Sequence, residues 1–189
     1  MSQFSRLARL ADRADVCKGL EAMDQLPQAP RIYVGGLKAL DNPEALQEKV
    51  SHILSVLEYD ACDWEEFSSF RRLHVQVEDY PGEDLIRHFE TTNQFLDTAI
   101  EEEGAVLVHC AMGISRSATV ICAYLMYKKG ITSQQALEMV REGRPFVDPN
   151  DGFLEQLDTY GRMLQAGSED GSSDIYNEWV NRKSAEIEV

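Results

Sequence analysis

The chain has few basic residues for its length. Only 18 lysines and arginines stand against 33 aspartates and glutamates in 189 residues, which gives a formal net charge of −15 at pH 7. Because like charges repel, a surface of this sign disfavours nucleic acids and anionic membranes. We therefore expect neither of them as a partner, and any site that binds an anion must rely on local donors.

Long apolar runs and paired cysteines are also missing. No segment approaches the roughly 20 residues that span a bilayer, and the first residues hold no signal-peptide core. The four cysteines, at positions 17, 62, 110 and 122, form neither a C-x-x-C pair nor a zinc-binding spacing with histidine. These absences predict a cytoplasmic and/or nuclear protein that needs no metal and no other cofactor.

Composition divides the chain into three parts. Hydrophobic residues make up 43% and charged residues 27%, which is typical of a globular domain. Residues 1–28 predict an N-terminal helical extension, residues 29–166 the central domain, and residues 167–189 an acidic linker and C-terminal tail. Within the tail, 167–173 has the composition of a flexible linker. The apolar residues at 175–180 favour a helix that folds back on its own domain, with docking onto a partner protein as the alternative.

Hydrophobic patterning predicts strands that alternate with helices. Apolar or alternating runs predict strands at 31–34, 52–56, 73–77 and 105–108, and helical spacing predicts helices at 43–50, 85–100, 117–129, 133–143 and from 150 onward. This alternation favours an α/β fold with a mostly parallel central sheet flanked by helices.

The stretch 109–117, His-Cys-Ala-Met-Gly-Ile-Ser-Arg-Ser, connects the last predicted strand to a helix. Loop amides that open a helix lack intrahelical partners, so they can converge on an anion. The residues expected to bind phosphate are Ala111, Met112, Gly113, Ile114, Ser115 and Arg116. Cys110 is the candidate nucleophile, because such a loop together with the Arg116 charge favours the thiolate. Lowering a thiol pKa by roughly 3 units takes about 4 kcal/mol of preferential stabilisation of the anion.

This stretch resembles the motif of the cysteine-based protein tyrosine phosphatases: His-Cys, five residues, Arg, then Ser or Thr. Five further blocks resemble the dual-specificity branch and occur in that family's order: 31–35, 52–56, 77–79, 123–126 and 149–157. The resemblance implies a protein tyrosine phosphatase-like fold and an atypical dual-specificity catalytic domain over 29–166. Segments 42–46 and 110–113 also resemble a fungal type that carries a C-terminal zinc module when full length. No cysteine follows residue 122, so we do not expect that module here.

The resemblance also implies catalytic roles. Cys110 would attack phosphorus and form a cysteinyl-phosphate, Arg116 would bind the transferring group, and Ser117 would donate a hydrogen bond to the sulfur. Asp79 would act as general acid and then as base. Glu78 and Asp84 are the competing acids nearby.

Three further residues are candidates for supporting roles. His109 is expected to orient the nucleophile loop, although a purely structural histidine fits equally well. Asn150 is expected to hold the same loop through its side-chain amide, or to cap the last helix. Arg144 is a weaker candidate, for contact with a second phosphate.

The predicted function is hydrolysis of phosphotyrosine and phosphoserine/threonine in a phosphoprotein substrate. The alternatives are a phosphoinositide or RNA 5′-phosphatase on the same scaffold, and a non-catalytic phosphate-binding scaffold. Lipid-directed relatives place lysines where this chain has Ala111 and Ile114, and inactive relatives lose the cysteine. A thiolate at Cys110 also predicts sensitivity to oxidation, with Cys62 or Cys122 as candidate disulfide partners.

Overall fold

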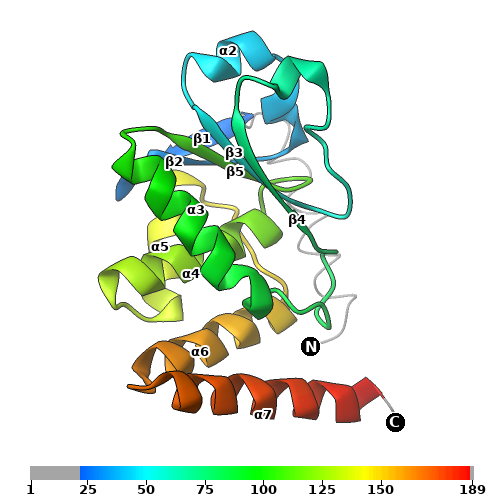
Figure 1. Cartoon of the computed structure of the whole chain (residues 1–189), viewed down its shortest axis with the longest axis vertical. Helices are drawn as coiled ribbons and strands as arrows, with labels where there is room; N and C mark the ends of the chain where they lie inside the picture. The colour runs from blue at the N-terminus through cyan, green and yellow to red at the C-terminus, as the bar shows by residue number, and fades with distance from the viewer. Residues whose placement is uncertain (1–21, 188–189) are drawn as a thin grey trace.

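A computed structural model describes residues 22–187, with side chains described as far as residue 185. Five strands form one sheet in the order β1-β2-β5-β3-β4. They are β1 (Met23–Leu26), β2 (Ala29–Gly35), β3 (His52–Leu57), β4 (Arg71–Gln76) and β5 (Val106–His109). β1 is antiparallel to β2, and the other pairs are parallel, so the predicted mostly parallel α/β sheet is confirmed (Figure 1).

Helices cover both faces of this sheet (Figure 1). The α-helices are α2 (Pro43–Gln47), α3 (Phe89–Glu101), α4 (Arg116–Lys129), α5 (Ser133–Gly143), α6 (Asp151–Gln165) and α7 (Glu169–Ile187). Three short 3-10 helices are η2 (Leu37–Leu40), η3 (Glu65–Phe67) and η4 (Ile86–His88). Helices α3 to α6 lie on one side of the sheet, and η2, α2 and η3 lie on the other.

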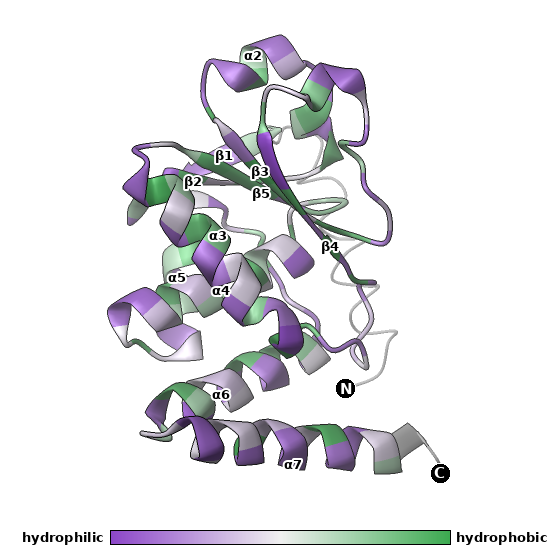
Figure 2. Cartoon of the chain, in the orientation of Figure 1, coloured by the Kyte–Doolittle hydropathy of each residue, from purple (hydrophilic) through white to green (hydrophobic). Residues whose placement is uncertain are grey.

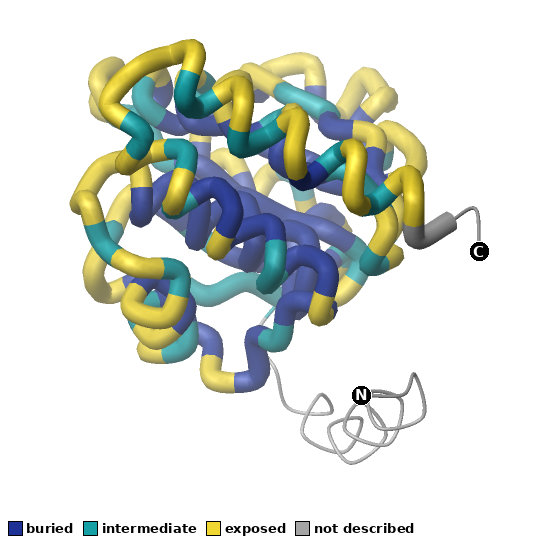
Figure 3. The backbone as a smooth tube through the Cα atoms, turned by 90° about the horizontal axis from the view of Figure 1, so that it is seen from below, coloured by how far each residue is buried: buried dark blue, intermediate teal, exposed yellow. Residues whose placement is uncertain are grey.

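Side chains of β3 point alternately to the two faces of the sheet, and each face packs into a separate hydrophobic cluster. All six residues of β3 are buried, as expected for a parallel strand covered on both faces. Leu54 and Val56 pack into the large cluster with α3 to α6, whereas Ile53 packs into the smaller cluster with Leu46 and Phe67. Figure 2 shows hydrophobic residues along these strands, and Figure 3 shows the buried backbone enclosed by more exposed segments.

Helix α4 runs through the centre of the larger layer, and every residue from Arg116 to Met126 is buried. It ends at Gly130, whose φ of 63° gives the left-handed C-cap that glycine adopts most readily. Because β5 leads directly into the loop before α4, the N-terminus of this buried helix points at the loop. The local fold therefore places residues 110–115 at the carboxyl edge of the sheet, where α/β folds bind ligands.

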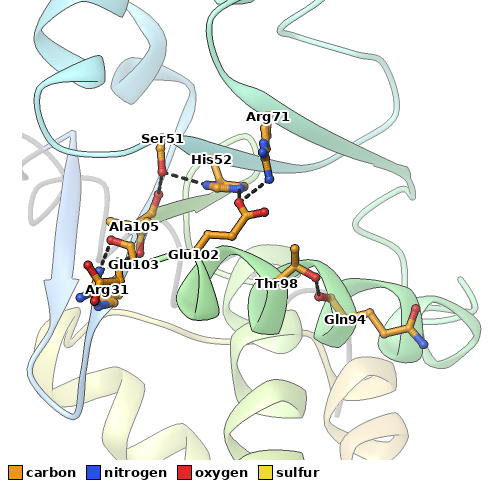
Figure 4. A network of polar contacts seen from close by, with 10 residues as sticks. Arg31, Ser51, His52, Arg71, Gln94, Thr98, Glu102, Glu103 and Ala105 are labelled. Atoms are coloured by element: carbon orange, nitrogen blue, oxygen red, sulfur yellow. Dashed lines mark hydrogen bonds and ion pairs between the residues drawn. The ribbon is translucent and has the colours of Figure 1, made fainter.

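The opposite edge of the sheet carries a separate polar network (Figure 4). Ser51 Oγ lies 2.9 Å from His52 Nδ1, and Glu102 Oε2 lies 3.7 Å from His52 Nε2. Glu102 also pairs with Arg71 at the start of β4. Burial is the main cause that lowers the pKa of His52, although Glu102 acts in the other direction. The network fastens the end of α3 to the amino ends of β3 and β4, far along the strands from residue 110.

The N-terminal prediction needs a correction. Within the segment 1–28, for which we expected helix, residues 23–26 form the edge strand β1, in register with β2 from Met23 opposite Gly35. The rest of the expected helix, residues 1–21, lies outside the described residues. The strand was missed because its pairing with β2, not its own apolar pattern, stabilises it.

The C-terminal segment also differs from the expected linker. Helix α7 begins at Glu169, so most of 167–173 is helical. Trp179 is only 3% exposed and packs with the main core, and Arg162 on α6 pairs with Glu178 at 3.2 Å. Burial of one face against α6 stabilises a helix whose composition alone indicates a flexible segment.

Candidate active site

The loop between β5 and α4 encloses Cys110, a residue that is only 2% exposed. The turn depends on Gly113, which has a φ of 68°. A Cβ atom there would lie 2.6 Å from the backbone carbon and oxygen of Gly35. Only glycine meets both demands, the left-handed backbone and the close approach to β2.

The Cys110 sulfur lies 3.3 Å from the Ser117 hydroxyl oxygen. Complete burial opposes ionisation of the thiol. Hydrogen bonds from the Ser117 hydroxyl and from the backbone of Ser117 and Met112, together with the Arg116 charge, nevertheless lower the pKa of Cys110 below its ordinary value. The structure thus brings together Cys110, Ser117 and Arg116, and it stabilises an anion at the sulfur.

Arg116 is 4% exposed, and its guanidinium makes two contacts. Its Nη1 donates to the Val77 carbonyl oxygen at 3.1 Å and pairs with Glu58 Oε1 at 2.8 Å. Partial burial acts against the ionised form of Glu58, but the Arg116 contact helps to keep the pKa of that carboxyl low. The Nε atom of Arg116 is buried and has no hydrogen-bond partner in the described part of the chain. A buried donor of this kind is suited to an anionic acceptor.

Asp79 lies beside the nucleophile loop. Its Oδ1 accepts hydrogen bonds from Ser115 Oγ at 2.7 Å and from Asn150 Nδ2 at 2.9 Å. Of the two competing acids, Glu78 is exposed, and Asp84 contacts Tyr176 and the Arg87 backbone instead. The geometry therefore favours Asp79 as the acid of the site.

Asn150 caps α6 as suggested, but it contacts the nucleophile loop through its backbone and not through its side-chain amide, which binds Asp79. Its backbone N–H donates to Ser115 Oγ at 3.1 Å, and its Oδ1 accepts from the Phe153 N–H at 2.9 Å as the cap of α6. One residue thus connects α6, Asp79 and the nucleophile loop.

His109 is buried and neutral. Its Nε2 lies 2.7 Å from Ser55 Oγ on the neighbouring strand β3. Burial is the main cause that lowers the pKa of His109 to about 4, while the Cys110 backbone acts in the other direction. The contact joins the start of the nucleophile loop to β3, and a ring with a pKa of about 4 is uncharged near pH 7, which fits both the orienting role and the structural role.

Arg144 does not lie where a second phosphate would bind. It is 2% exposed, its Nε donates to the Gly113 carbonyl at 2.9 Å, and its Nη2 donates to the Met112 carbonyl at 3.1 Å. It also forms an ion pair with Asp24 on β1. The suggested contact with substrate is therefore wrong, and Arg144 supports the nucleophile loop from behind.

Sequence reasoning missed three residues of this arrangement: Glu58, Ser55 and Asp24. Glu58 directly follows the buried strand β3, and that position at the carboxyl edge was a usable signal. Ser55 is a polar residue inside the same buried strand, which indicates a buried partner. Asp24 gave no signal, because its segment was expected to be helical.

Two general features of the described residues complete the picture. Between residues 22 and 187, no group of three or more histidine, cysteine, aspartate or glutamate side chains is arranged to hold a metal ion. In the same range, no helix is both long enough and apolar enough to cross a membrane.

Comparisons with known proteins agree with the geometry. Residues 32–163 match the family model described as "Dual specificity phosphatase, catalytic domain". A probable dual specificity protein phosphatase of Dictyostelium discoideum is 35% identical over 140 residues, which are 74% of this chain and 35% of that protein. The crystal structure of human DUSP28 matches with a TM-score of 0.71 and 33% identity, covering 77% of this chain and 97% of that one. The Yvh1 phosphatase domain of Chaetomium thermophilum matches with a TM-score of 0.69 and 32% identity, covering 78% and 100%.

The chain spans between 21% and 48% of the length of the first curated relatives that it matches. The matched range 32–163 is more than half of the 189 residues, and it contains the nucleophile loop, Asp79 and Asn150. The chain therefore belongs to the atypical dual-specificity phosphatases of the protein tyrosine phosphatase superfamily, and it carries their catalytic domain.

Proposed function

We propose that this chain hydrolyses phosphotyrosine and phosphoserine/threonine in phosphoproteins, through a phosphoryl group carried by Cys110. The observation that carries the proposal is a thiol whose pKa is lowered, in part by the Arg116 charge, together with a buried Arg116 Nε that has no partner in the described protein. A phosphate oxygen would supply the acceptor that this donor lacks.

In the first step, the Cys110 thiolate attacks phosphorus in line with the scissile bond. An S–P bond forms as the P–O bond breaks, and Arg116 neutralises the charge on the equatorial oxygens. The leaving oxygen of tyrosine, serine or threonine takes a proton from Asp79. Phosphotyrosine should react faster, because a phenolate is the better leaving group.

In the second step, water attacks the phosphorus of the cysteinyl-phosphate. Asp79, now ionised, takes one proton from the water, the S–P bond breaks, and inorganic phosphate leaves. The Ser117 hydroxyl, 3.3 Å from the sulfur, donates to the departing thiolate and stabilises it. The site thus returns to its starting state without any other reactant.

The features of the loop argue against the alternatives. Ala111 and Ile114 occupy the positions where lipid-directed relatives carry lysines, and Ile114 is buried. The net charge of −15 disfavours an RNA substrate. Cys110 and Arg116 belong to the nucleophile loop, and Asp79 contacts it through Ser115. This arrangement favours catalysis over simple binding.

The test uses three peptides of one sequence that differ only in carrying phosphotyrosine, phosphoserine or phosphothreonine. Phosphate release should be measured for the wild type and for Cys110→Ser, Asp79→Asn and Glu78→Gln. We expect Cys110→Ser to abolish turnover and Asp79→Asn to lower kcat by roughly 10²- to 10⁴-fold, the usual contribution of general acid catalysis. Glu78→Gln is the matched control and should retain full activity.

The proposal would be wrong if the Cys110→Ser variant still released phosphate, since the chemistry would then lie elsewhere. An inactive wild type would support the scaffold alternative. Faster turnover of a phosphoinositide than of a phosphopeptide would support the lipid alternative. Covalent phosphate on Cys110, detected by mass spectrometry after rapid acid quenching, is the direct positive result.

A further inference from the structure

The C-terminal helix α7 contacts the loop that carries Asp79, at the end of that loop away from the phosphate-binding residues. The Tyr176 hydroxyl donates a hydrogen bond of 2.6 Å to Asp84 Oδ2, and Asp84 Oδ1 accepts from the Arg87 N–H at 3.3 Å. Asp84 follows Asp79 in the same loop, residues 77–85, which we name the acid loop. Helix α7 lies beyond the family match at 32–163, so this contact comes from outside the matched catalytic domain.

Helix α6 already holds the acid loop through its backbone. The Gln156 Nε2 donates to the Glu83 carbonyl at 2.7 Å, and the Gln156 Oε1 accepts from the Leu85 N–H at 2.7 Å. The Pro81 carbonyl oxygen lies so close to α6 that a Cβ atom on Gly152 would be 1.9 Å from it. The acid loop is therefore packed closely against α6, and Tyr176 adds a hydrogen bond to the Asp84 side chain near the end of this loop.

The Tyr176 ring is itself held in position. It stacks on the buried Trp179 ring, with centroids 6.3 Å apart and an interplanar angle of 23°. Lys183 pairs with Glu155 at 2.7 Å and fixes α7 further along its length. Partial burial and the Asp84 carboxylate raise the pKa of Tyr176 to about 12, so the phenol stays protonated near pH 7.

We propose that Tyr176 is a positioning residue for the general acid: its bond to Asp84 holds the acid loop so that Asp79 stays beside the nucleophile loop. This inference rests on the proposed function, in which Asp79 protonates the leaving group. Asp79 is bound to Ser115 and Asn150 at 2.7 and 2.9 Å, distances that leave little room for displacement. Loss of the Tyr176 bond leaves this end of the loop held less firmly, and a shift of about 1 Å in a catalytic group can cost up to roughly 100-fold in rate.

The test compares two substrates with Tyr176→Phe, which removes only the hydroxyl. A phosphotyrosine peptide has a leaving group that needs a proton, whereas an aryl phosphate with a strongly acidic phenol does not. Asp79 also acts as the base of the second step, which is common to both substrates, so the readout is kcat/KM, which reports the first step alone. We expect Tyr176→Phe to lower kcat/KM on the peptide by about 3- to 10-fold, a fraction of a full general-acid contribution, and to leave kcat/KM on the acidic aryl phosphate unchanged.

Two further variants separate positioning from general damage. Glu178→Gln breaks the pair between Arg162 and Glu178, which also joins α6 to α7 but does not touch the acid loop, so both substrates should react at the wild-type rate. Asp84→Ala removes the acceptor, and the double variant with Tyr176→Phe should lose no more than Asp84→Ala alone. If thermal melting shows that Tyr176→Phe folds poorly, the Asp84→Ala result decides.

Equal losses on the two substrates would show that α7 only stabilises the fold and would overturn the inference. Unchanged turnover of the phosphotyrosine peptide by both Tyr176→Phe and Asp84→Ala would overturn it as well. These outcomes differ from failure of the proposed function, in which the wild type itself lacks Cys110-dependent turnover.

Discussion

Replacing Ser117 with alanine removes one donor from the Cys110 sulfur and leaves the loop backbone in place. The hydroxyl oxygen lies 3.3 Å from the sulfur, and Ser117 is fully buried. A hydrogen bond to a charged group contributes about 1.5–3 kcal/mol, and one pKa unit corresponds to about 1.4 kcal/mol. We therefore expect Ser117→Ala to raise the pKa of the Cys110 thiol by about 1 to 2 units.

The same change should slow the second chemical step more than the first. The departing thiolate loses its donor, so the cysteinyl-phosphate breaks down more slowly and accumulates. Stopped-flow measurements with an aryl phosphate should then show a burst of phenol followed by slow turnover. The burst amplitude should approach one equivalent of enzyme.

The pKa can be measured from the rate of alkylation by iodoacetamide as a function of pH, with the Cys110 peptide followed by mass spectrometry. Cys62 and Cys122 serve as internal references, because burial raises the pKa of both thiols. Thr119→Val is the matched control: it removes a buried hydroxyl that donates to the Ser115 carbonyl at 2.8 Å without touching the sulfur. A change below about 0.3 pKa units in Ser117→Ala, or an equal change in Thr119→Val, would refute the reasoning.

Two further changes test the support of the nucleophile loop. Arg144→Lys should lower kcat/KM by roughly 10- to 100-fold, because a lysine ammonium cannot reproduce the fork of donors that reaches the Gly113 and Met112 carbonyls. Asp24→Asn, which keeps both carbonyl contacts, should lose far less, and equal losses would contradict this role. For His109, the unfolded chain takes up the proton first as the pH falls from 6.5 toward the folded-state pKa of about 4. The stability that the buried, uncharged His109 contributes is therefore fully present above pH 6.5 and is lost as the pH falls from 6.5 toward 4. In urea titrations from pH 7 to pH 5, the wild type should lose about 2 kcal/mol more than His109→Gln, and parallel losses would exclude His109 as the cause.

The nucleophile loop could be predicted from the sequence because all of its determinants are local. An apolar strand, a cysteine, a glycine and a helix N-terminus follow one another within 105–117. The structure shows that Gly113 has the backbone that only glycine adopts readily and that α4 is buried behind it. Neighbours in sequence are necessarily neighbours in space, so no tertiary information was needed.

The two ends of the chain show where local reasoning fails. Residues 23–26 are too short and too polar to indicate a strand, and they form one because β2 offers its edge. Residues 169–173 look like a linker, and they are helical because Trp179 and its neighbours are buried against the domain. In both cases tertiary contacts outweigh a weak local preference.

By itself, the sequence determined that the chain has an α/β fold with a thiol and an arginine around one phosphate-binding loop. The family resemblance selected Asp79 among the acidic residues, but only the tertiary structure showed that its carboxylate contacts Ser115 of that loop, that Glu58 and Arg144 support the loop, and that Tyr176 contacts the acid loop. The physical reason is distance along the chain: parallel strands bring their carboxyl ends together, but strand register and helix packing select the side chains that meet there.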